Sequence, residues 1–457
     1  MSEWKLKKLG DLGIIKTGKT PSSKILGAFD LSGIPFITPK DMHNKKIVDN
    51  TERYLSPNGF EAVKNCVIPK NSVCVSCIGT VGLVVLTKES SITNQQINSL
   101  IVDENINNPD FLYYLLSSIK ETIKLLASSG SVVPILNKTD FSKIQVKIPN
   151  KKTQDTISSY LKCLDDKITL NTQTNQTLEQ IAQGIFKHWF IDFAPVHAKA
   201  NALARGETTE QAELAAMACL SGKTMEKITA LKTQDPTAYH QLQQTAAAFP
   251  SEFVETEMGK VPRGWEVKQV KDMGKIICGK TPSKKKEEFY GNDIPFIKIP
   301  DMHNNTFIIK TTDNLTLLGA NNQKTKFIEK GSICISCIAT VGLVSITSER
   351  SQTNQQINSI VPNSEIFTEY LYLYFSQDTM NKKLKDLASG GSATLNLNTT
   401  AFSNITLLTP NNNLIEFFHK KVQPVFDKIL SNKKENISLS DIRDELLPKL
   451  LSGEIEL

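Results

Sequence analysis

The 457-residue sequence has no run of about 18 uninterrupted apolar residues, which is what a transmembrane helix requires. Its first ten residues, MSEWKLKKLG, lack the apolar core of a secretory signal peptide. The chain has only eight cysteines, and without such a signal we expect reduced thiols rather than a disulfide framework. These absences argue against a membrane or secreted protein, and we expect the protein to be cytoplasmic.

Charge and composition exclude two further classes. The chain carries 53 Lys and Arg against 47 Asp and Glu, a net charge of +6, and its contents of 40% apolar and 22% charged residues are ordinary for a globular protein. Disordered and fibrous proteins are therefore excluded. At roughly 150 residues per domain, the length predicts two or three domains with cores of their own.

The most informative feature is an internal repeat with a period of about 260 residues. Its order is kept throughout, and a period this long indicates a duplicated domain rather than a solenoid. The recurring pairs are Trp4 and Trp265, TGKTPS (17–22) and CGKTPS (278–283), IPFITPKDMHN (34–44) and IPFIKIPDMHN (294–304), CVSCIGTVGLV (74–84) and CISCIATVGLV (334–344), TNQQINS (93–99 and 353–359), and LASSGS (126–131) and LASGGS (387–392).

Each repeat has a globular part and a helical part. In the first, β-branched runs at 72–75 and 82–86 predict strands, and 110–126 predicts a helix, so that an α+β domain is expected. Residues 195–262, an Ala-rich helical insert and linker, have no counterpart after the second helical part. The predicted divisions are a first globular domain at 1–150, a long helix at 151–194, the insert at 195–262, a second globular domain at 263–411 and a C-terminal long helix at 412–457.

Both helical parts carry an apolar seam whose spacings alternate between four and three residues. Such a heptad pattern, kept for over four heptads, is what a long helix needs to pack along another. Arg443 is the lone charged seam position. The seam positions are Ile157, Leu161, Leu164, Ile168, Asn171, Asn175, Leu178, Ala182, Ile185 and Trp189, and then Phe418, Val422, Val425, Ile429, Asn432, Asn436, Leu439, Arg443, Leu446 and Leu450.

Two asparagines recur in each seam: Asn171 and Asn175 in the first, Asn432 and Asn436 in the second. Asparagine in an apolar seam costs stability but fixes the register, because its amide is satisfied only opposite a polar group. We interpret these residues as register pins. The alternative is that they mark a solvent-facing break between two shorter helices.

The distribution of charge indicates which parts face an anionic partner. Residues 1–149 hold 18 basic and 13 acidic residues and residues 263–410 hold 17 and 13, whereas the helical parts are slightly acidic. Lysine and arginine on the repeated domains would neutralise phosphates, and the helices are suited to protein contacts. At about 1.5 Å per residue the first seam spans roughly 48 Å, so the helix pair is predicted to act as a ruler between the domains.

This ordered set of segments resembles the specificity (S) subunit of type I restriction-modification systems, over essentially the whole chain. The features that match are the GKTPS turn, the IPFI and DMHN segment, the TVGLV and TNQQ segments and the domain-closing helix, while KVPRGWEV (260–267) resembles the usual start of the second recognition domain. The resemblance implies two target-recognition domains that alternate with two long antiparallel coiled-coil helices, related by a pseudo-twofold axis.

The resemblance also implies partners. In that family one S subunit binds double-stranded DNA and two methyltransferase subunits, which bring S-adenosylmethionine and methylate adenine, and motor-nuclease subunits join for restriction. This chain lacks the Asn- or Asp-Pro-Pro-aromatic motif of an adenine methyltransferase, and no histidine has a sequence context that suggests a nucleophilic triad. We therefore expect a non-catalytic reader that binds no cofactor and no metal itself.

Two similar domains related by a pseudo-dyad would each read half of a split site. An upper limit of about 48 Å corresponds to roughly 14 base pairs, so a separation near one helical turn is feasible. Because the domains share many loop residues, we predict that the half-sites are related and approximately palindromic. The candidate readers of bases or phosphates are Lys19, Lys40, His43, Asn44, Lys45, Gln95, Gln96 and Ser129, and then Lys280, Lys284, Lys285, Lys286, His303, Asn304, Gln355, Gln356 and Ser389.

Some of these candidate DNA readers can also be explained by a purely structural role. In TNQQINS, Asn and Thr at strand ends often satisfy local backbone groups, and the Lys284–Lys286 run fits a solvated loop equally well. A coiled-coil adaptor without DNA binding would explain the helices but not the basic duplicated domains.

The residues 13–20 and 274–281 also match the phosphate-binding G-x-x-x-x-G-K-[ST] loop, which would indicate a duplicated nucleotide hydrolase. That chemistry requires a buried strand before the loop and a helix that starts at the lysine. Thr20 and Thr281 are each followed by proline, which disfavours the helical conformation. The upstream segments are also too polar for a central strand, so we reject this interpretation.

The paired C-x-x-C units, Cys74 with Cys77 and Cys334 with Cys337, have a spacing typical of zinc ligands. In a strand, however, residues three apart point to opposite faces, and no further His or Cys lies nearby in sequence. We therefore predict buried thiols that pack as small hydrophobic groups.

Overall fold

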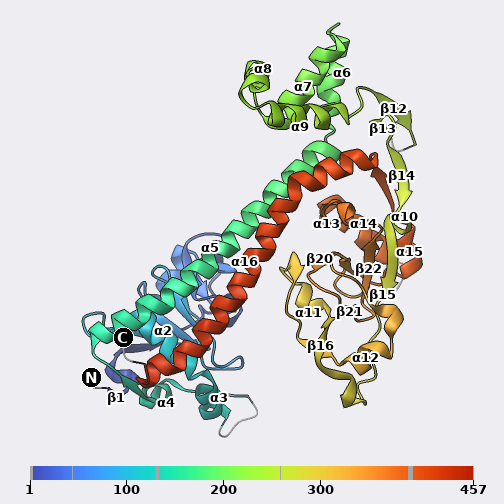
Figure 1. Ribbon diagram of the computed structural model, residues 1–457. Helices are drawn as coiled ribbons and strands as arrows, with labels where there is room; N and C mark the ends of the chain where they lie inside the picture. Colours follow the sequence, from blue (N-terminus) through green and yellow to red (C-terminus); the bar gives the residue numbers. More distant parts are fainter. Residues whose placement is uncertain (1–3, 44, 129–132, 258, 390–394, 456–457) are drawn as a thin grey trace. The chain divides into compact units, whose positions relative to one another are not determined.

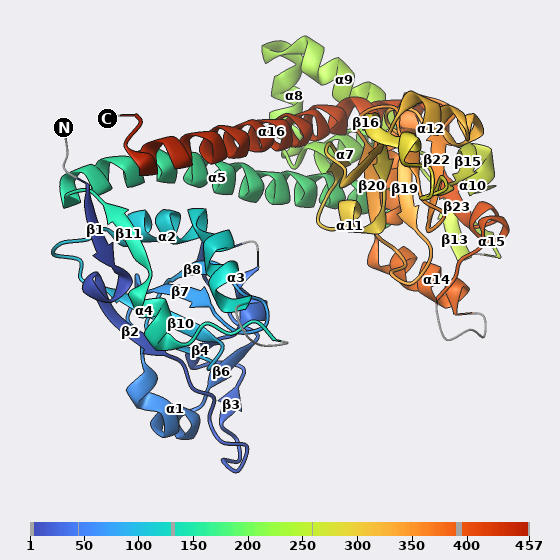
Figure 2. The ribbon, with the colours of Figure 1, turned by 90° about the horizontal axis from the view of Figure 1, so that it is seen from below.

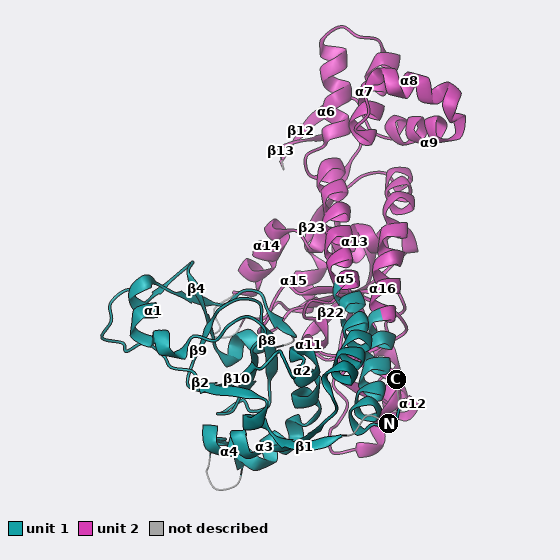
Figure 3. Cartoon of the chain, turned by 90° about the vertical axis from the view of Figure 1, so that its left-hand side faces the viewer, with its two compact units in different colours: residues 1–169, 436–457 teal, residues 170–435 magenta. Residues whose placement is uncertain are grey.

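The computed structural model describes residues 4–43, 45–128, 133–257, 259–389 and 395–455. The chain divides into two compact units, the first formed by residues 1–169 and 436–457 and the second by residues 170–435 (Figure 3). Each unit contains the globular part of one copy of the sequence repeat, together with a portion of both long helices.

Unit 1 is an α+β domain built on two small sheets. Its five-stranded sheet has the order β2-β10-β7-β8-β5 and its four-stranded sheet the order β3-β6-β4-β9, while β1 pairs with β11. The strands are β1 Lys5–Lys8, β2 Gly13–Thr17, β3 Phe29–Asp30, β4 Ile34–Ile37, β5 Ile47–Val48, β6 Arg53–Leu55, β7 Val73–Ser76, β8 Val84–Thr87, β9 Ile92–Thr93, β10 Ile97–Val102 and β11 Gln145–Ile148. Strands β7 and β8 are buried on both faces, which explains their runs of valine.

Short helices accompany the sheets of unit 1. They are α1 Pro57–Val63, α2 Pro109–Ser118, α3 Lys120–Ser128 and α4 Lys138–Lys143, with short 3-10 turns η1 Leu9–Asp11, η2 Pro39–Met42 and η3 Lys64–Cys66. Helix α2 begins at an Asn108 cap and lies against β7 and β8 (Figure 2). The predicted strands at 72–75 and 82–86 are confirmed as β7 and β8, but the single helix predicted over 110–126 is divided at Ile119, which ends α2.

Unit 2 repeats the plan with strand order β15-β22-β19-β20-β17 in its five-stranded sheet. A three-stranded sheet, β18-β16-β21, and the pair β14 with β23 accompany it. The strands are β14 Glu266–Gln269, β15 Gly274–Cys278, β16 Tyr290–Ile297, β17 Phe307–Ile308, β18 Asp313–Leu315, β19 Ile333–Ser336, β20 Val344–Thr347, β21 Gln352–Thr353, β22 Ile357–Pro362 and β23 Thr406–Thr409. The helices are α10 Val270–Met273, α11 Ile299–Met302, α12 Leu317–Asn321, α13 Thr368–Phe375, α14 Asp378–Ala388 and α15 Thr399–Ser403, with 3-10 turns η4 Glu287–Phe289, η5 Lys324–Lys326 and η6 Glu365–Phe367.

The insert of unit 2 is a group of four short helices followed by a hairpin (Figure 1). Its elements are α6 Ala194–Ala204, α7 Thr209–Ser221, α8 Met225–Gln234, α9 Pro236–Ala247, β12 Phe253–Thr256 and β13 Gly259–Pro262. A small core of Ala216, Met217, Ile228 and Ala246 holds α7, α8 and α9 together. The high alanine content therefore serves close packing of short helices.

The long helices α5 Lys151–Phe190 and α16 Asn412–Ser452 are each continuous and run antiparallel, side by side (Figure 1). In unit 1, Ile157 and Leu161 share a buried core with Leu450. In unit 2, Phe186 packs on Phe418, with ring centroids 5.9 Å apart. The alternative of a solvent-facing break at the asparagines is wrong, because both helices pass through those positions without interruption. No helix in the described parts of the chain carries an apolar stretch long enough to cross a membrane.

Candidate nucleic-acid interface

In unit 1, four of the repeated segments meet at one end of the five-stranded sheet. Strands β2 and β7 both pair antiparallel with β10, so β2 and β7 end where β10 begins. Strand β8 begins at the same end because it is antiparallel to β7, and β5 is parallel to β8. The loops attached to these strand ends are GKTPS (18–22), DMHNK (41–45), CIGTVGL (77–83) and TNQQ (93–96). We call this edge the loop end of the sheet.

The GKTPS turn is fixed directly to the TNQQ loop. The backbone N–H of Lys19 donates to the carbonyl of Thr93 at 2.9 Å, and the hydroxyl of Thr20 donates to Oε1 of Gln95 at 2.7 Å. A Cβ atom on Gly18 would lie 2.1 Å from the Thr93 carbonyl oxygen, so the turn requires glycine. These contacts leave Lys19 and Gln95 exposed at the loop end.

The second glutamine of TNQQ serves the fold. The backbone N–H of Gln96 donates to Oδ1 of Asn94 at 3.1 Å, and Nδ2 of Asn94 donates to Oε1 of Gln96 at 2.8 Å. The backbone N–H of Cys77 donates to the Gln96 carbonyl at 2.7 Å. The local structural role left open for TNQQINS is therefore seen for Asn94 and Gln96, whereas Gln95 faces solvent.

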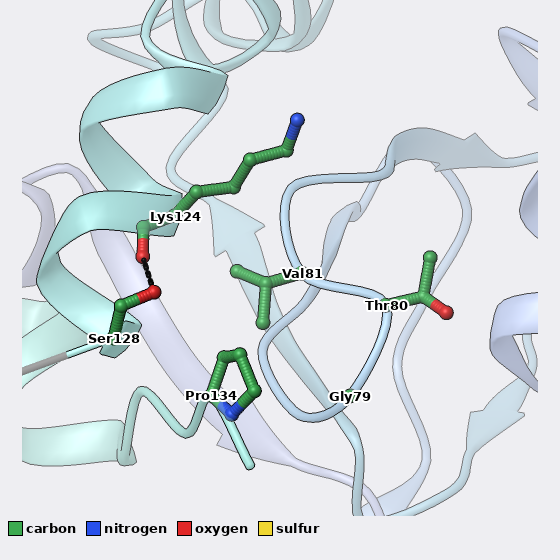
Figure 4. Close-up of a pocket in the computed structure, with 6 residues that line it drawn as sticks. All are labelled: Gly79, Thr80, Val81, Lys124, Ser128 and Pro134. Atoms are coloured by element: carbon green, nitrogen blue, oxygen red, sulfur yellow. Dashed lines mark hydrogen bonds between the residues drawn. The ribbon is translucent and has the colours of Figure 1, made fainter. Parts of the chain in front are cut away.

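The CIGTVGL turn borders a shallow hollow of about 310 Å³ at the loop end. Its lining comes from the turn itself, from α3 and from Pro134, whose carbonyl accepts from the Gly79 N–H at 3.2 Å. Figure 4 shows the Val81 side chain between α3 and Pro134, whereas the Thr80 hydroxyl points away from them. The amine of Lys124 is paired with Glu121 at 2.8 Å.

The DMHNK segment begins within a capped 3-10 turn, since Asp41 and Met42 belong to η2. Oδ2 of Asp41 accepts from both the backbone N–H and the hydroxyl of Thr38 at 2.8 Å, which holds η2 in place. Within this turn, Lys40 forms an exposed ion pair with Glu52 at 3.6 Å. Exposed pairs such as this one contribute little stability, so Lys40 is available for exchange with a phosphate. Lys45 is half-buried and donates to Asp49 at 2.8 Å and to Asn50 at 2.6 Å.

The loop end of unit 2 has most of the hydrogen bonds found at the loop end of unit 1. The backbone N–H of Lys280 donates to the Thr353 carbonyl at 2.9 Å, and the hydroxyl of Thr281 donates to Oε1 of Gln355 at 2.5 Å. Gln356 is again tied to Asn354, through its backbone N–H at 3.1 Å. The run Lys284–Lys286 continues from this turn and is exposed, with the Lys286 amine 4.9 Å from the centre of the Phe289 ring.

The candidate readers therefore fall into three groups. Asn44 and Ser129 lie outside the described residues. Lys45, Gln96 and Gln356 are half-buried in local contacts, and the hydroxyl of Ser389, although exposed, donates to the Lys385 carbonyl at 2.7 Å. The other candidates are exposed, namely Lys19, Lys40, His43, Gln95, Lys280, Lys284, Lys285, Lys286, His303, Asn304 and Gln355.

The seam asparagines bridge the two helices. Nδ2 of Asn432 donates to Oδ1 of Asn175 at 2.8 Å, and Nδ2 of Asn175 donates to the Ile429 carbonyl at 3.2 Å. Nδ2 of Asn171 donates to Glu435 at 2.8 Å, and Nδ2 of Asn436 donates to the Ile168 carbonyl at 3.3 Å. Each of these contacts is specific to one alignment of the helices. Their role in fixing the register remains a proposal.

The nucleotide-hydrolase alternative is contradicted by the local structure. Residues 13–17 and 274–278 form strands β2 and β15 rather than loops, and no helix begins at Lys19 or Lys280. The backbone N–H groups of Gly18 and Lys19 donate to the carbonyls of Ile97 and Thr93, and those of Gly279 and Lys280 donate to the carbonyls of Ile357 and Thr353. They are therefore not available to surround a phosphate chain as the hydrolase loop requires.

The C-x-x-C units are buried thiols in two different cores. Cys74 belongs to the cluster of Ile37 and Met42, whereas Cys77 belongs to that of Val73 and Val75, as expected for opposite faces of a strand. Burial raises the pKa of Cys74 to about 12 and of Cys77 to about 11, so both stay protonated. Within the described ranges no three His, Cys, Asp or Glu side chains gather as a metal site would need.

Comparison with known proteins identifies the family. The sequence profile of the family described as "Type I restriction modification DNA specificity domain" matches residues 1–180 and 262–439. The chain is also 48% identical, over 470 residues that cover 100% of both proteins, to the HindI specificity subunit of Haemophilus influenzae. The chain is a type I restriction-modification specificity subunit. Its role is therefore recognition of the DNA target rather than catalysis.

More distant relatives agree with this assignment. The MjaIX specificity subunit of Methanocaldococcus jannaschii is 27% identical over 468 residues, which cover 99% of this chain and 94% of the relative. The crystal structure of the S subunit from M. genitalium has a TM-score of 0.52 at 16% identity and covers 98% of this chain and 96% of its own. That likeness bears on the fold alone, and it supports the α+β fold with two repeated domains and two long helices.

Sequence reasoning missed several polar residues that attach this specificity subunit's loop ends to its helices. They include Lys46, Asp165 and Arg443 in unit 1, and Glu179 and Lys433 in unit 2. The only available signal was the charged residue Arg443 in an apolar seam, which had no assigned partner.

Proposed function

We propose that this specificity subunit reads a split DNA site, one half with the loop end of unit 1 and the other with the loop end of unit 2. The observation that carries this proposal is the recurrence of the same motifs, with the same internal hydrogen bonds, at the same end of both five-stranded sheets. The exposed candidates named above are the proposed readers. The recognition domains are then residues 1–150 and 263–411.

The proposed partners follow from membership of a type I restriction enzyme. Two methyltransferase subunits bind along the helices at 151–194 and 412–457, and they bring S-adenosylmethionine, so this chain itself needs no cofactor. Motor-nuclease subunits join for restriction. The whole assembly acts on chromosomal and invading DNA in the cytoplasm. No role is assigned to the insert at 195–262.

The proposal is tested by methylome sequencing of the host, together with binding of the purified chain and its methyltransferase to DNA duplexes. We expect a bipartite motif with two similar halves in opposite orientation, because the exposed loop residues Gln95 and Gln355 or His43 and His303 are shared. Unrelated halves would refute the palindromic relation alone. Binding without any sequence preference would refute the proposed function and favour a coiled-coil adaptor.

We further propose that the helix pair sets the spacing of the two halves. One extra heptad in each helix adds about 10 Å. The spacer in the methylated motif is then expected to grow by about three base pairs, at roughly 3.4 Å each. An unchanged spacer would refute this part of the proposal without affecting the rest.

A further inference from the structure

In unit 1, the DMHNK segment is attached to the helix pair by the residue that follows it. The amine of Lys46 lies 2.8 Å from the Tyr114 hydroxyl, 2.8 Å from the Asp110 carboxylate and 3.6 Å from Asp165 on α5. The Lys46 side chain is only 16% exposed. Lys46 is therefore committed to these internal partners, in contrast to its exposed neighbour His43.

Asp165 is the centre of this cluster. Its Oδ2 accepts from the Tyr114 hydroxyl at 2.5 Å, and its Oδ1 accepts from Nη1 of Arg443 on α16 at 2.7 Å. One carboxylate thus joins the DMHNK segment, helix α2 and both long helices. This explains the charged residue in the second seam, since Arg443 pairs across the seam with Asp165.

In unit 2, the corresponding segment is attached to both helices by different residues. Thr306, at the repeat position of Lys46, donates to Oε2 of Glu179 on α5 at 2.8 Å, and the Tyr372 hydroxyl donates to Oε1 of Glu179 at 2.5 Å. From α16, the amine of Lys433 donates to Oδ1 of Asn305 at 2.9 Å. Burial lowers the pKa of Lys433 to about 8.

Both units attach this segment to the long helices, although they use different residues. The repeat position of Asp165 is Phe426, which packs against Tyr372 and Phe307 in an ordinary apolar contact. Apolar packing was therefore available at this joint, and buried charges cost more desolvation than they return unless their geometry is well fixed. The charged and hydroxyl groups differ from apolar groups because their hydrogen bonds are directional, so each bond holds the segment in one orientation.

We propose that Asp165 and Glu179 are positioning residues, each of which fixes the DMHN segment of its own domain to the helix pair. Exposed residues in or next to the segment, His43 and Lys40 in unit 1 or His303 and Asn304 in unit 2, are then presented to DNA at a set place. This inference rests on the proposed function. It predicts that the loss of one carboxylate weakens the reading of one half-site only.

The experiment uses the full chain in complex with its methyltransferase, as wild type and as Asp165→Asn and Glu179→Gln. Binding is measured to the full site, to duplexes with a base change in either half, and to unrelated DNA. We expect each variant to lose about tenfold of the discrimination at one half-site, a size comparable with that of one mismatch, while discrimination at the other half stays unchanged. The two variants should affect opposite halves.

Matched variants separate positioning from folding. Asp444 is the second partner of Arg443, at 2.8 Å, and within the described ranges it has no hydrogen bond or ion pair with the loop end, so Asp444→Asn should leave discrimination at both halves unchanged. If Asp165→Asn or Glu179→Gln does not fold, Tyr114→Phe and Thr306→Val remove single hydroxyls from the same clusters. They should produce the same half-site selectivity at smaller size.

Three outcomes would overturn the inference. Equal loss at both halves, equal loss for unrelated DNA, or unchanged discrimination would each mean that the carboxylates act only in stability. If the wild-type complex itself shows no discrimination, the proposed function fails first, and the inference fails with it.

Discussion

The asparagine pair in the helix seam of unit 2 provides a quantitative test of the register proposal. Asn175 and Asn432 are 8% and 1% exposed and share one hydrogen bond of 2.8 Å. Oδ1 of Asn432 is buried without a hydrogen-bond partner among the described residues. The pair therefore already contains one unsatisfied group, which makes its replacement informative.

The expected free energies follow from the groups left unpaired. Asn175→Leu leaves both ends of the Asn432 amide without a partner, at a cost of about 1–3 kcal/mol. Asn432→Leu leaves Oδ1 of Asn175 unpaired but removes the orphaned oxygen of Asn432, so a cost of about 1 kcal/mol is expected. The double leucine variant removes every unpaired group, and replacement of both partners by apolar groups is nearly neutral. The interaction energy is therefore about 2 kcal/mol or more.

Thermal unfolding of the full chain measures this cycle. For a unit of this size, about 1 kcal/mol corresponds to roughly 2–4 °C in Tm, so each single variant should lose a few degrees. The double variant should melt near the wild type, yet methylate less efficiently in complex because the register is no longer specified. A double variant that loses the sum of the two single losses would refute this account of the seam.

Three further predictions concern other parts of the chain. Lys19→Gln should weaken binding to all DNA sequences alike and reduce the salt slope by about one unit; a change confined to one sequence would instead make Lys19 a base reader. The carboxylate of Glu369, 2.6 Å from Nδ1 of His419, raises the pKa of His419, so this pair stabilises the fold fully below the ordinary pKa of 6.5 and loses its contribution as the pH rises through the raised value. His419→Gln should therefore lower Tm more at pH 6 than at pH 9, and an equal loss at both pH values would argue against the charged pair. A thiol reagent at pH 8 should label the exposed Cys163 first, the half-buried Cys66, Cys219 and Cys278 next and the buried C-x-x-C cysteines last. A variant with serine at the first four positions should show only slow labelling; a fast phase that persists in that variant would show that a buried thiol is reactive.

The repeat and the helix seam could be predicted because both are periodic in the sequence. A heptad pattern is a direct consequence of one helix packing along another, and the long helices α5 and α16 agree with it. The division of the predicted helix at Ile119 could not be predicted, since no glycine or proline marks it. It depends on how α2 packs against the sheet.

The polar attachments could not be predicted for a different reason. Lys46 and Thr306 occupy the same repeat position but have different chemistry, and Asp165 corresponds to Phe426. A comparison of the two halves selects what is identical, so it overlooks a function that is kept by different residues. Their partners come from elements far apart in the chain, such as Asp165 and Arg443, and only the fold brings them together.

Residues that are identical in the two halves support a palindromic site only where the fold does not already require them. Gly18 and Asn94 are identical in both halves for steric and hydrogen-bonding reasons, so they carry no information about the bases. Gln95 and Gln355 are identical and exposed, as are His43 and His303, and the proposed relation between the half-sites depends on such pairs.

Directly after the turn that contacts Gln95 or Gln355 the two halves differ, because the exposed Lys284–Lys286 run replaces the sequence SKI of residues 23–25. We propose that these lysines contact phosphates, since half to two-thirds of protein–DNA hydrogen bonds go to the phosphate and sugar groups. The two half-sites should therefore share the bases read near Gln95 and Gln355. Removal of the lysines from unit 2 should lower the salt slope without altering the motif, whereas an altered motif would place base reading in the lysine run itself.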